Sequence, residues 1–543
     1  MHGDIRTFET VFLLLLGFVV VLGELARRLK VAYPIVLVLG GLLLSLFPDL
    51  PRVRLNPELF FLAVLPPLLF HAAWLTSLRE FRYNLASILL LAFGLVVFTV
   101  TGVAIAGERL FLLLNWKTGF LLGAILAPTD AIAAASIAKR VGLPGRITDV
   151  LEGESLINDA SGLLGLEFAL ALIMSGETPS ASIGVLRLLY LVLAGILVGL
   201  VVAWTVHWLE LHIDDAPIEL TVGLLSAYTA YILAEKIHAS GVLAVVTAGF
   251  YLSRESATFF SPPVRLQAYA LWDTIDFVLN GLVFVLIGLQ LPFILAGLHN
   301  YTSVTLLLDA IAINVIIIGL RLVWVYPSSY IAYLFQRHVL KQPEPRPQVK
   351  QVFITGWTGM RGVLALAAAL SIPETLSDGR AFPGRNLILF LTFSVILVTL
   401  VLQGLTLPWL IRFLGLGGAD EDHSEEAYAR LHMQNAARIY LEAGTMRGSL
   451  KAAAIFPEFV QPDDFHVGGS LIELPNDAPM DRADRLTITL QVLNVQRQAI
   501  VDLRGQGRIN DRLLRTLERD LDLRETQVLD ARNSRLGIPA TKS

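Results

Sequence analysis

The chain has 543 residues, of which 55% are hydrophobic and only 16% are charged, and its mean hydropathy is +0.65. This composition is too apolar for a soluble globular protein and indicates a polytopic membrane protein. The formal net charge of −4 gives no support for nucleic-acid binding. The sequence contains no cysteine, which excludes disulfides, thiolate chemistry and cysteine-ligated metals.

Apolar runs that could each cross a bilayer, with about 20 residues apiece, recur about thirteen times before residue 412. Their centres lie near Leu16, Leu42, Leu65, Leu95, Pro128, Gly162, Gly195, Ser226, Val246, Val278, Val315, Arg361 and Leu400. The N-terminus lacks the basic start and the cleavage site of a signal peptide, so residues 8–25 are predicted to form the first span. Lysine and arginine are about twice as abundant in the loops after odd-numbered spans, which predicts an external N-terminus and a cytoplasmic C-terminus.

The third predicted span contains Pro66 and Pro67, followed by His71. Histidine can titrate in the physiological pH range. A lone histidine near the end of a span most often has a packing role, so the residue type alone favours a structural His71. Asp273 and Asp276, in the tenth span, are interpreted as interfacial or packing charges.

The fifth predicted span is interrupted at its centre by Pro128, Thr129 and Asp130. Proline removes a helix hydrogen bond, so we expect the chain to unwind here and expose the carbonyls near Ala127 and Thr129. These carbonyls could coordinate a cation, and Asp130 could face the N-terminus of the second half-helix. A simple proline kink with a capping aspartate is the alternative.

The sixth predicted span carries two polar pairs, each spaced four residues apart. Ser155 and Asp159 share one helix face, and Glu154 and Asn158 share another. Carboxylates that face lipid would be too costly, so this span is predicted to lie inside a helix bundle. A buried ion-pair network without a transport role is the alternative.

Two arginines lie within later spans. Arg361 is flanked by Gly359 and Gly362, which predicts a second broken helix in the twelfth span. Arg321 of the eleventh span could reach the interface or could form an ion pair with Glu154. Because the two predicted breaks are seven spans apart, we expect spans one to six to be repeated in inverted form as spans eight to thirteen.

After residue 412 the charged residues become more than twice as dense, and no apolar run is long enough to span. Residues 425–442 and 482–529 are predicted to be helical, with a break at Gly505 and Gly507. Residues 457–481 are rich in proline and aspartate and are predicted to form a loop. We therefore expect residues 413–543 to form a cytoplasmic helical tail, with a regulatory role.

Five motifs resemble those of bacterial monovalent cation:proton antiporters of the first cation/proton antiporter family, the NhaP and NHE type. They are Pro66-Pro67-Leu68-Leu69-Phe70, Ala127-Pro128-Thr129-Asp130-Ala131, Glu152-Gly153-Glu154-Ser155-Leu156-Ile157-Asn158-Asp159, Leu320-Arg321-Leu322 and Gly359-Met360-Arg361-Gly362. The resemblance implies an all-α fold of about 13 transmembrane helices with inverted repeats and two broken crossing helices, within residues 1–412. It also implies a homodimer in the cell inner membrane.

The same resemblance implies a division of the transmembrane domain into two parts. The dimerisation part would comprise about residues 8–75 and 185–290. The core part would comprise about residues 84–174 and 304–412, and would hold both broken helices.

The resemblance further implies that Asp159 binds either the cation or the proton, assisted by Thr129 and Ser155. Asn158 would orient the site, and Glu154 would pair with Arg321. An Asn-Asp arrangement goes with one-for-one exchange, whereas two adjacent aspartates often go with electrogenic exchange.

Two positions depart from the family pattern, and both bear on the site. Ala131 stands where a proline is common, although Pro128 still marks the break. His71 stands where many relatives have an acidic residue or asparagine, so it is a candidate for setting ion selectivity.

These features together predict a sodium/proton antiporter, which is not an enzyme and needs no cofactor. Its partners would be Na⁺ (or K⁺ or Li⁺), H⁺ and membrane lipid. Potassium/proton exchange is the first alternative. An intramembrane aspartyl protease built on Asp130 and Asp159 lacks the expected sequence context. An ion channel would instead give currents that persist without a proton gradient.

Overall fold

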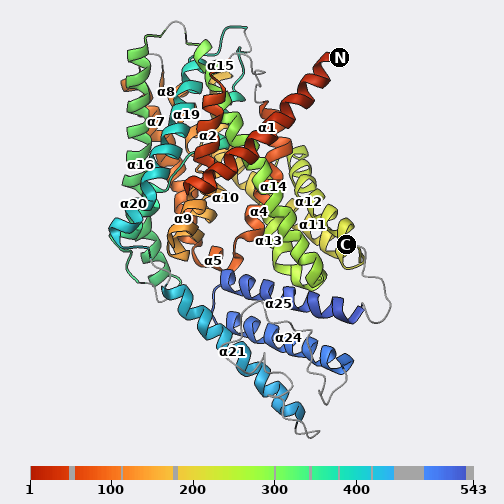
Figure 1. Ribbon diagram of the computed structural model, residues 1–543. Coiled ribbons are helices and arrows are strands. Elements are labelled where there is room, and N and C mark those ends of the chain that lie inside the picture. The colour runs from red at the N-terminus through yellow and green to blue at the C-terminus, as the bar shows by residue number, and fades with distance from the viewer. Residues whose placement is uncertain are drawn as a thin grey trace. The chain divides into compact units, whose positions relative to one another are not determined.

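The computed structural model describes residues 2–47, 56–111, 114–174, 181–298, 301–341, 345–376, 379–417, 420–445 and 482–533. Almost all of these residues are helical (Figure 1). Within these ranges no β-sheet forms, and the one isolated β-bridge joins Thr375 to Ala381. The predicted all-α fold class is therefore confirmed.

The helices up to residue 141 are α1 (His2–Leu29), α2 (Tyr33–Leu44), α3 (Pro57–Leu59), η1 (Phe60–Val64), α4 (Leu65–Leu75), α5 (Leu78–Tyr83), α6 (Leu85–Leu89), η2 (Leu90–Leu95), α7 (Val96–Leu110), α8 (Trp116–Leu126) and α9 (Ala131–Val141). The next are α10 (Gly145–Met174), α11 (Ala181–Glu210), α12 (Ala216–Lys236), α13 (Gly241–Phe259), α14 (Pro262–Leu289), α15 (Leu291–Ala296) and α16 (Ser303–His338). The last before the tail are α17 (Val349–Trp357), α18 (Val363–Leu370), α19 (Arg385–Val398), η3 (Thr399–Gln403) and α20 (Gly404–Leu414).

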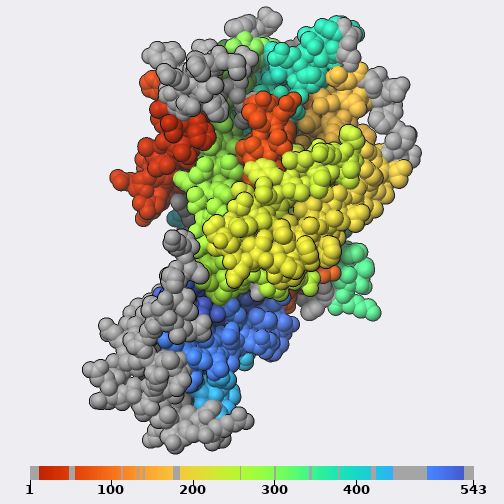
Figure 2. Space-filling model, turned by 90° about the vertical axis from the view of Figure 1, so that its right-hand side faces the viewer, coloured from red at the N-terminus to blue at the C-terminus, as the bar shows by residue number. Residues whose placement is uncertain are grey.

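Among the described residues, 8 helical segments are long and apolar enough to cross a membrane. The prediction of about thirteen crossings also counts shorter and broken segments, and it stays a prediction. On α11, the side chains of Leu186, Leu193 and Trp204 are each more than 60% exposed. This apolar face, yellow in Figure 2, is typical of a helix that contacts lipid or another subunit.

The chain divides into two compact units. The first comprises Met1–Leu209, Thr221–Glu255 and Trp272–Gly418, and the second comprises Glu210–Leu220, Ser256–Leu271 and Ala419–Ser543. The composition change after residue 412 therefore lies close to one boundary. The inclusion of two earlier segments in the second unit is a feature that composition did not reveal. The division of the transmembrane part into dimerisation and core parts remains a prediction.

The tail helices of the second unit are α21 (Asp420–Thr445), α24 (Arg482–Gly505) and α25 (Asp511–Asn533). They correspond to the two predicted helical stretches, and the break after Gly505 lies where it was expected. Their shared apolar core includes Met433, Ile500 and Leu517. The predicted loop at 457–481 lies outside the described residues.

An ion-paired network lies within the second unit. Arg265, in the first turn of α14, donates from Nε and Nη2 to the two carboxylate oxygens of Asp522 on α25, at 2.7 and 2.8 Å. Arg497 of α24 donates to the same carboxylate at 2.8 Å. Because both Arg265 and Asp522 are buried, this bidentate pair fixes α25 against the first turn of α14.

Two helices of the first unit are broken where the sequence predicted it. The first break separates α8 from α9 and contains Pro128, which cannot donate a backbone hydrogen bond. The second break separates α17 from α18 and contains Gly359 and Gly362. The neighbouring helices α7, α10 and α16 pack around these two segments (Figure 1).

Candidate cation and proton site

The two helix breaks contact each other directly. The backbone N–H of Asp130 donates to the carbonyl of Met360 at 2.8 Å. A Cβ atom added to Gly362 would overlap the Asp130 carboxylate, and one added to Gly359 would overlap the Arg321 side chain. The glycines are therefore needed for close approach, and the contact brings four half-helix ends together.

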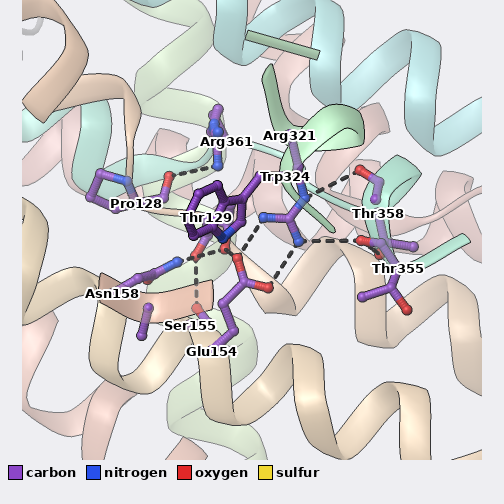
Figure 3. A network of polar contacts seen from close by, with 12 residues as sticks. Pro128, Thr129, Glu154, Ser155, Asn158, Arg321, Trp324, Thr355, Thr358 and Arg361 are labelled. Atoms are coloured by element: carbon purple, nitrogen blue, oxygen red, sulfur yellow. Dashed lines mark hydrogen bonds and ion pairs between the residues drawn. The ribbon is translucent and has the colours of Figure 1, made fainter. Parts of the chain in front are cut away.

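Thr129, in the first break, is the centre of a buried hydrogen-bond network (Figure 3). Its hydroxyl donates to Glu154 Oε1 at 3.1 Å and accepts from Asn158 Nδ2 at 2.7 Å. Its carbonyl accepts from the Ser155 hydroxyl at 2.8 Å. The network thus holds the unwound segment against α10.

The Thr129 network corrects one expectation. The carbonyl of Thr129 was expected to be free for a cation, but it is occupied by Ser155. The Pro128 carbonyl also has a donor, because Arg361 Nη1 lies 3.4 Å from it. The side chains at the break satisfy these carbonyls because an unpaired carbonyl would be costly at this depth. By contrast, Asn158 Oδ1 is buried without a hydrogen-bond partner among the described residues.

Glu154 and Arg321 form a fully buried ion pair between α10 and α16. The guanidinium donates to both carboxylate oxygens, with 2.9 Å between Nη2 and Oε2. Arg321 also donates to the carbonyls of Gly356 and Thr355 at 3.2 and 3.3 Å. These carbonyls lie in the last turn of α17, as expected for an arginine at the end of a half-helix (Figure 3). Arg321 does not reach toward the interface, which was the alternative reading.

Asp159 lies one turn after Ser155 on α10, and only 9% of the residue is exposed. Within the described part of the chain, no hydrogen bond or ion pair to its carboxylate is present. Asp159 thus differs from Glu154, whose charge is balanced by an arginine.

Asp130 and Arg361 occupy the centre of the crossing. Asp130 directly precedes α9, its own second half-helix, and its carboxylate also lies against Gly362, the residue before α18. Arg361 is fully buried, and its Nε and Nη2 have no hydrogen-bond partner among the described residues. Its backbone N–H donates to Thr399 Oγ1 at 3.0 Å. Sequence reasoning missed Thr399, because a lone threonine in an apolar span gives no signal.

His71 is not part of this network. Its ring lies between Asp276 and Asp273 of α14, with Nδ1–Oδ1 and Nε2–Oδ1 distances of 3.4 and 3.8 Å. The two aspartates, which were predicted to be interfacial or packing charges, are therefore the acidic neighbours of His71. The role of His71 in ion selectivity stays a prediction.

The chain is also similar to known proteins. The family profile described as "Sodium/hydrogen exchanger, transmembrane" matches residues 13–413. An uncharacterised Na⁺/H⁺ exchanger of Mycobacterium tuberculosis is 35% identical, with 97% of each chain covered. A sodium, potassium, lithium and rubidium/H⁺ antiporter of Bacillus subtilis is 35% identical over 69% of this chain and 57% of its own length.

The fold is also similar to that of a solved structure, the sodium proton antiporter MjNhaP1 from Methanocaldococcus jannaschii. The TM-score is 0.58 at 20% sequence identity, and the match covers 76% of this chain and 99% of that one. At this identity the likeness shows the fold alone. Together with the profile that covers most of the chain, it places the protein in the sodium/hydrogen exchanger family, as a multi-pass membrane sodium/proton antiporter.

Proposed function

We propose that the protein exchanges one sodium ion for one proton by alternating access, and that Asp159 binds each in turn. The observation that carries this proposal is the contrast between two buried carboxylates on α10. Glu154 is neutralised by Arg321, whereas Asp159 has no cationic partner among the described residues and lies beside two broken helices. A buried carboxylate without a partner needs either a proton or a cation.

Competition at one carboxylate couples the two ions. A protonated Asp159 cannot hold sodium, and a sodium-bound Asp159 cannot hold the proton. Thr129 and Ser155 are the proposed neighbouring ligands, since each presents a hydroxyl oxygen at the break. The unpartnered Oδ1 of Asn158 offers a further neutral oxygen, which suits a hard monovalent cation.

The activity is tested with purified protein in proteoliposomes that contain a pH-sensitive dye. An outward proton gradient should drive sodium uptake, and sodium pulses should collapse the gradient. The same vesicles should carry no steady current when voltage is applied without a proton gradient. A sustained current would indicate a channel instead of an exchanger.

We expect exchange to be electroneutral. Asn158 is neutral, and Asp130 is held against the start of α18, where the helix dipole favours the ionised form. Asp159 alone would then change its occupant, trading one positive charge for another. In vesicles clamped with potassium and valinomycin, a membrane potential without a pH gradient should drive no sodium uptake. If it does, Asp130 is the first residue to examine as a second titrating group.

Potassium/proton exchange is the second candidate. The Bacillus subtilis relative is named for sodium, potassium, lithium and rubidium, and its similarity covers 69% of this chain. Pulses of sodium, potassium and lithium chloride at equal concentration rank the three cations directly. A larger response to potassium than to sodium would assign the potassium function.

We further propose an inner-membrane homodimer with an external N-terminus and a cytoplasmic tail. Because the chain has no cysteine, single cysteines can be introduced without further changes. Val304 and Val339 are matched sites at the two ends of α16, 68% and 61% exposed. In intact spheroplasts, an impermeant maleimide should label Val304→Cys but should label Val339→Cys only after permeabilisation. The reverse pattern would invert the topology.

A further inference from the structure

His71 lies between two carboxylates of another helix, outside the exchange site. The residue is on α4, and Asp273 and Asp276 are one turn apart on α14. Both helices are labelled in Figure 1. Its ring is parallel to that of Trp272, with an interplanar angle of 7° and 6.1 Å between centroids. This stacking fixes the ring so that each nitrogen faces a different carboxylate.

The arrangement suits the passage of a proton through the ring. A neutral imidazole has one N–H donor and one acceptor nitrogen, so it can take a proton on one side and release another from the opposite side. Within the described residues, Asp273 and Asp276 are the charged groups in contact with the ring. Helix α13, which also packs on α4, places the uncharged Gly249 and Ser253 against the backbone of Phe70 and Trp74.

The two ends of this row differ in exposure. The side chain of Asp273 is 65% exposed and that of Asp276 is 27% exposed, and the His71 side chain between them is 8% exposed. Both aspartates lie near the middle of α14, where a carboxylate that faces lipid would be too costly. We infer that water reaches Asp273, and that the row leads from water into the protein.

The other end of the row faces the protein interior. Asp276 Oδ1 accepts from the fully buried Asn280 Nδ2 at 2.9 Å, which holds the carboxylate in place. The next residue, Phe277, packs on Tyr33 of α2, with 6.3 Å between the ring centroids. Helix α2 in turn contacts α9, the half-helix that follows the first break.

We propose that Asp273, His71 and Asp276 form a proton relay that serves the exchange site and is separate from the ligands of the cation. In the relay, the proton of a protonated Asp273 passes to His71 Nε2, and the proton on Nδ1 passes to Asp276 Oδ1. Asp273 ends ionised, His71 ends neutral and Asp276 ends protonated, so no charge is gained or lost. Chains of aspartate and histidine serve this purpose in other membrane transporters. The inference rests on the proposed exchange at Asp159.

The test compares two fluxes in proteoliposomes, because only one of them needs a proton. His71→Gln should lower sodium-driven proton flux at saturating sodium about tenfold, with the KM for sodium unchanged. Exchange of ²²Na⁺ for unlabelled sodium at equal pH should stay within about twofold of the original rate. If His71→Gln folds poorly, Asp276→Asn takes its place. This variant should also lower sodium-driven proton flux and leave sodium–sodium exchange nearly unchanged. His338→Gln, at an exposed histidine of α16, is the matched control and should leave both fluxes unchanged.

A second measurement separates a relay from a packing role. Imidazole added to both sides of vesicles that contain His71→Ala should restore part of the proton flux, since a free base can replace the missing carrier. Equal loss of both fluxes without rescue by imidazole, or no loss of either, would overturn the relay. If the unmodified protein exchanges sodium for sodium but never for protons, the proposed antiport at Asp159 fails instead.

Discussion

Asp159→Asn is expected to reduce sodium/proton exchange to the rate of empty vesicles while the protein stays folded. Asparagine is close to aspartate in shape, but it neither binds a proton in this pH range nor offers a negative charge to sodium. Because Asp159 has no hydrogen-bond or ionic partner among the described residues, its replacement removes no contact that holds the helices together. The response of a pH dye to sodium measures the loss of exchange. The melting temperature in detergent measures whether the protein stays folded.

The matched control for Asp159→Asn is Asp309→Asn. Asp309 is also a carboxylate within a membrane helix, but it lies twelve positions before Arg321 on α16, about 18 Å along the axis. It should keep nearly full exchange. Cation-dependent proton flux in the Asp159 variant would show that the exchange site lies elsewhere, and a similar loss in the Asp309 variant would show that the effect is not specific.

Removing either partner of the Glu154–Arg321 pair is expected to destabilise the protein by about 3–5 kcal/mol, because a buried charge is left uncompensated. Arg321→Leu should be the more harmful change. Among the described residues it leaves Glu154 with the Thr129 hydroxyl as its one remaining donor, whereas Glu154→Gln leaves Arg321 with the carbonyls of Gly356 and Thr355. The double variant should lose less than the sum of the two single losses. Melting temperatures in detergent compare the losses of stability in the two single variants and the double variant.

An exposed pair serves as the control for this cycle. Arg28 and Glu24 of α1 are 2.9 Å apart, but the Arg28 side chain is 77% exposed. Glu24→Gln should therefore change the melting temperature little. Strict additivity of the Glu154 and Arg321 changes would contradict a direct interaction, whatever the size of each single effect.

The helix breaks could be predicted from sequence because their causes are local. Pro128 lacks a donor and Gly362 lacks a Cβ, so both act on their own segment. The partner of Glu154 could also be predicted, since few arginines lie within spans and each needs an anion or free carbonyls. These predictions depend on chemistry that a residue carries wherever it is placed.

The contact of Asp130 with the second break and the partners of His71 could not be predicted in the same way. The sequence places Asp130 before its own half-helix, but it does not show that the carboxylate also lies against Gly362. His71 meets Asp273 and Asp276 through the packing of α4 against α14. Both facts depend on which distant segments become neighbours, and residue spacing along one helix carries no such information.

The contact between the two breaks has a consequence for biosynthesis. Arg361 and Pro128, which meet across the crossing, are 233 positions apart in the chain. At about 5–20 residues per second, the ribosome would need roughly 10–50 s to reach the second after making the first. During that interval the amide of Asp130 lacks the Met360 carbonyl that accepts its hydrogen bond in the finished protein. The newly inserted N-terminal half would thus wait in the membrane with an incomplete helix pair, in need of water or another temporary partner until the C-terminal half arrives.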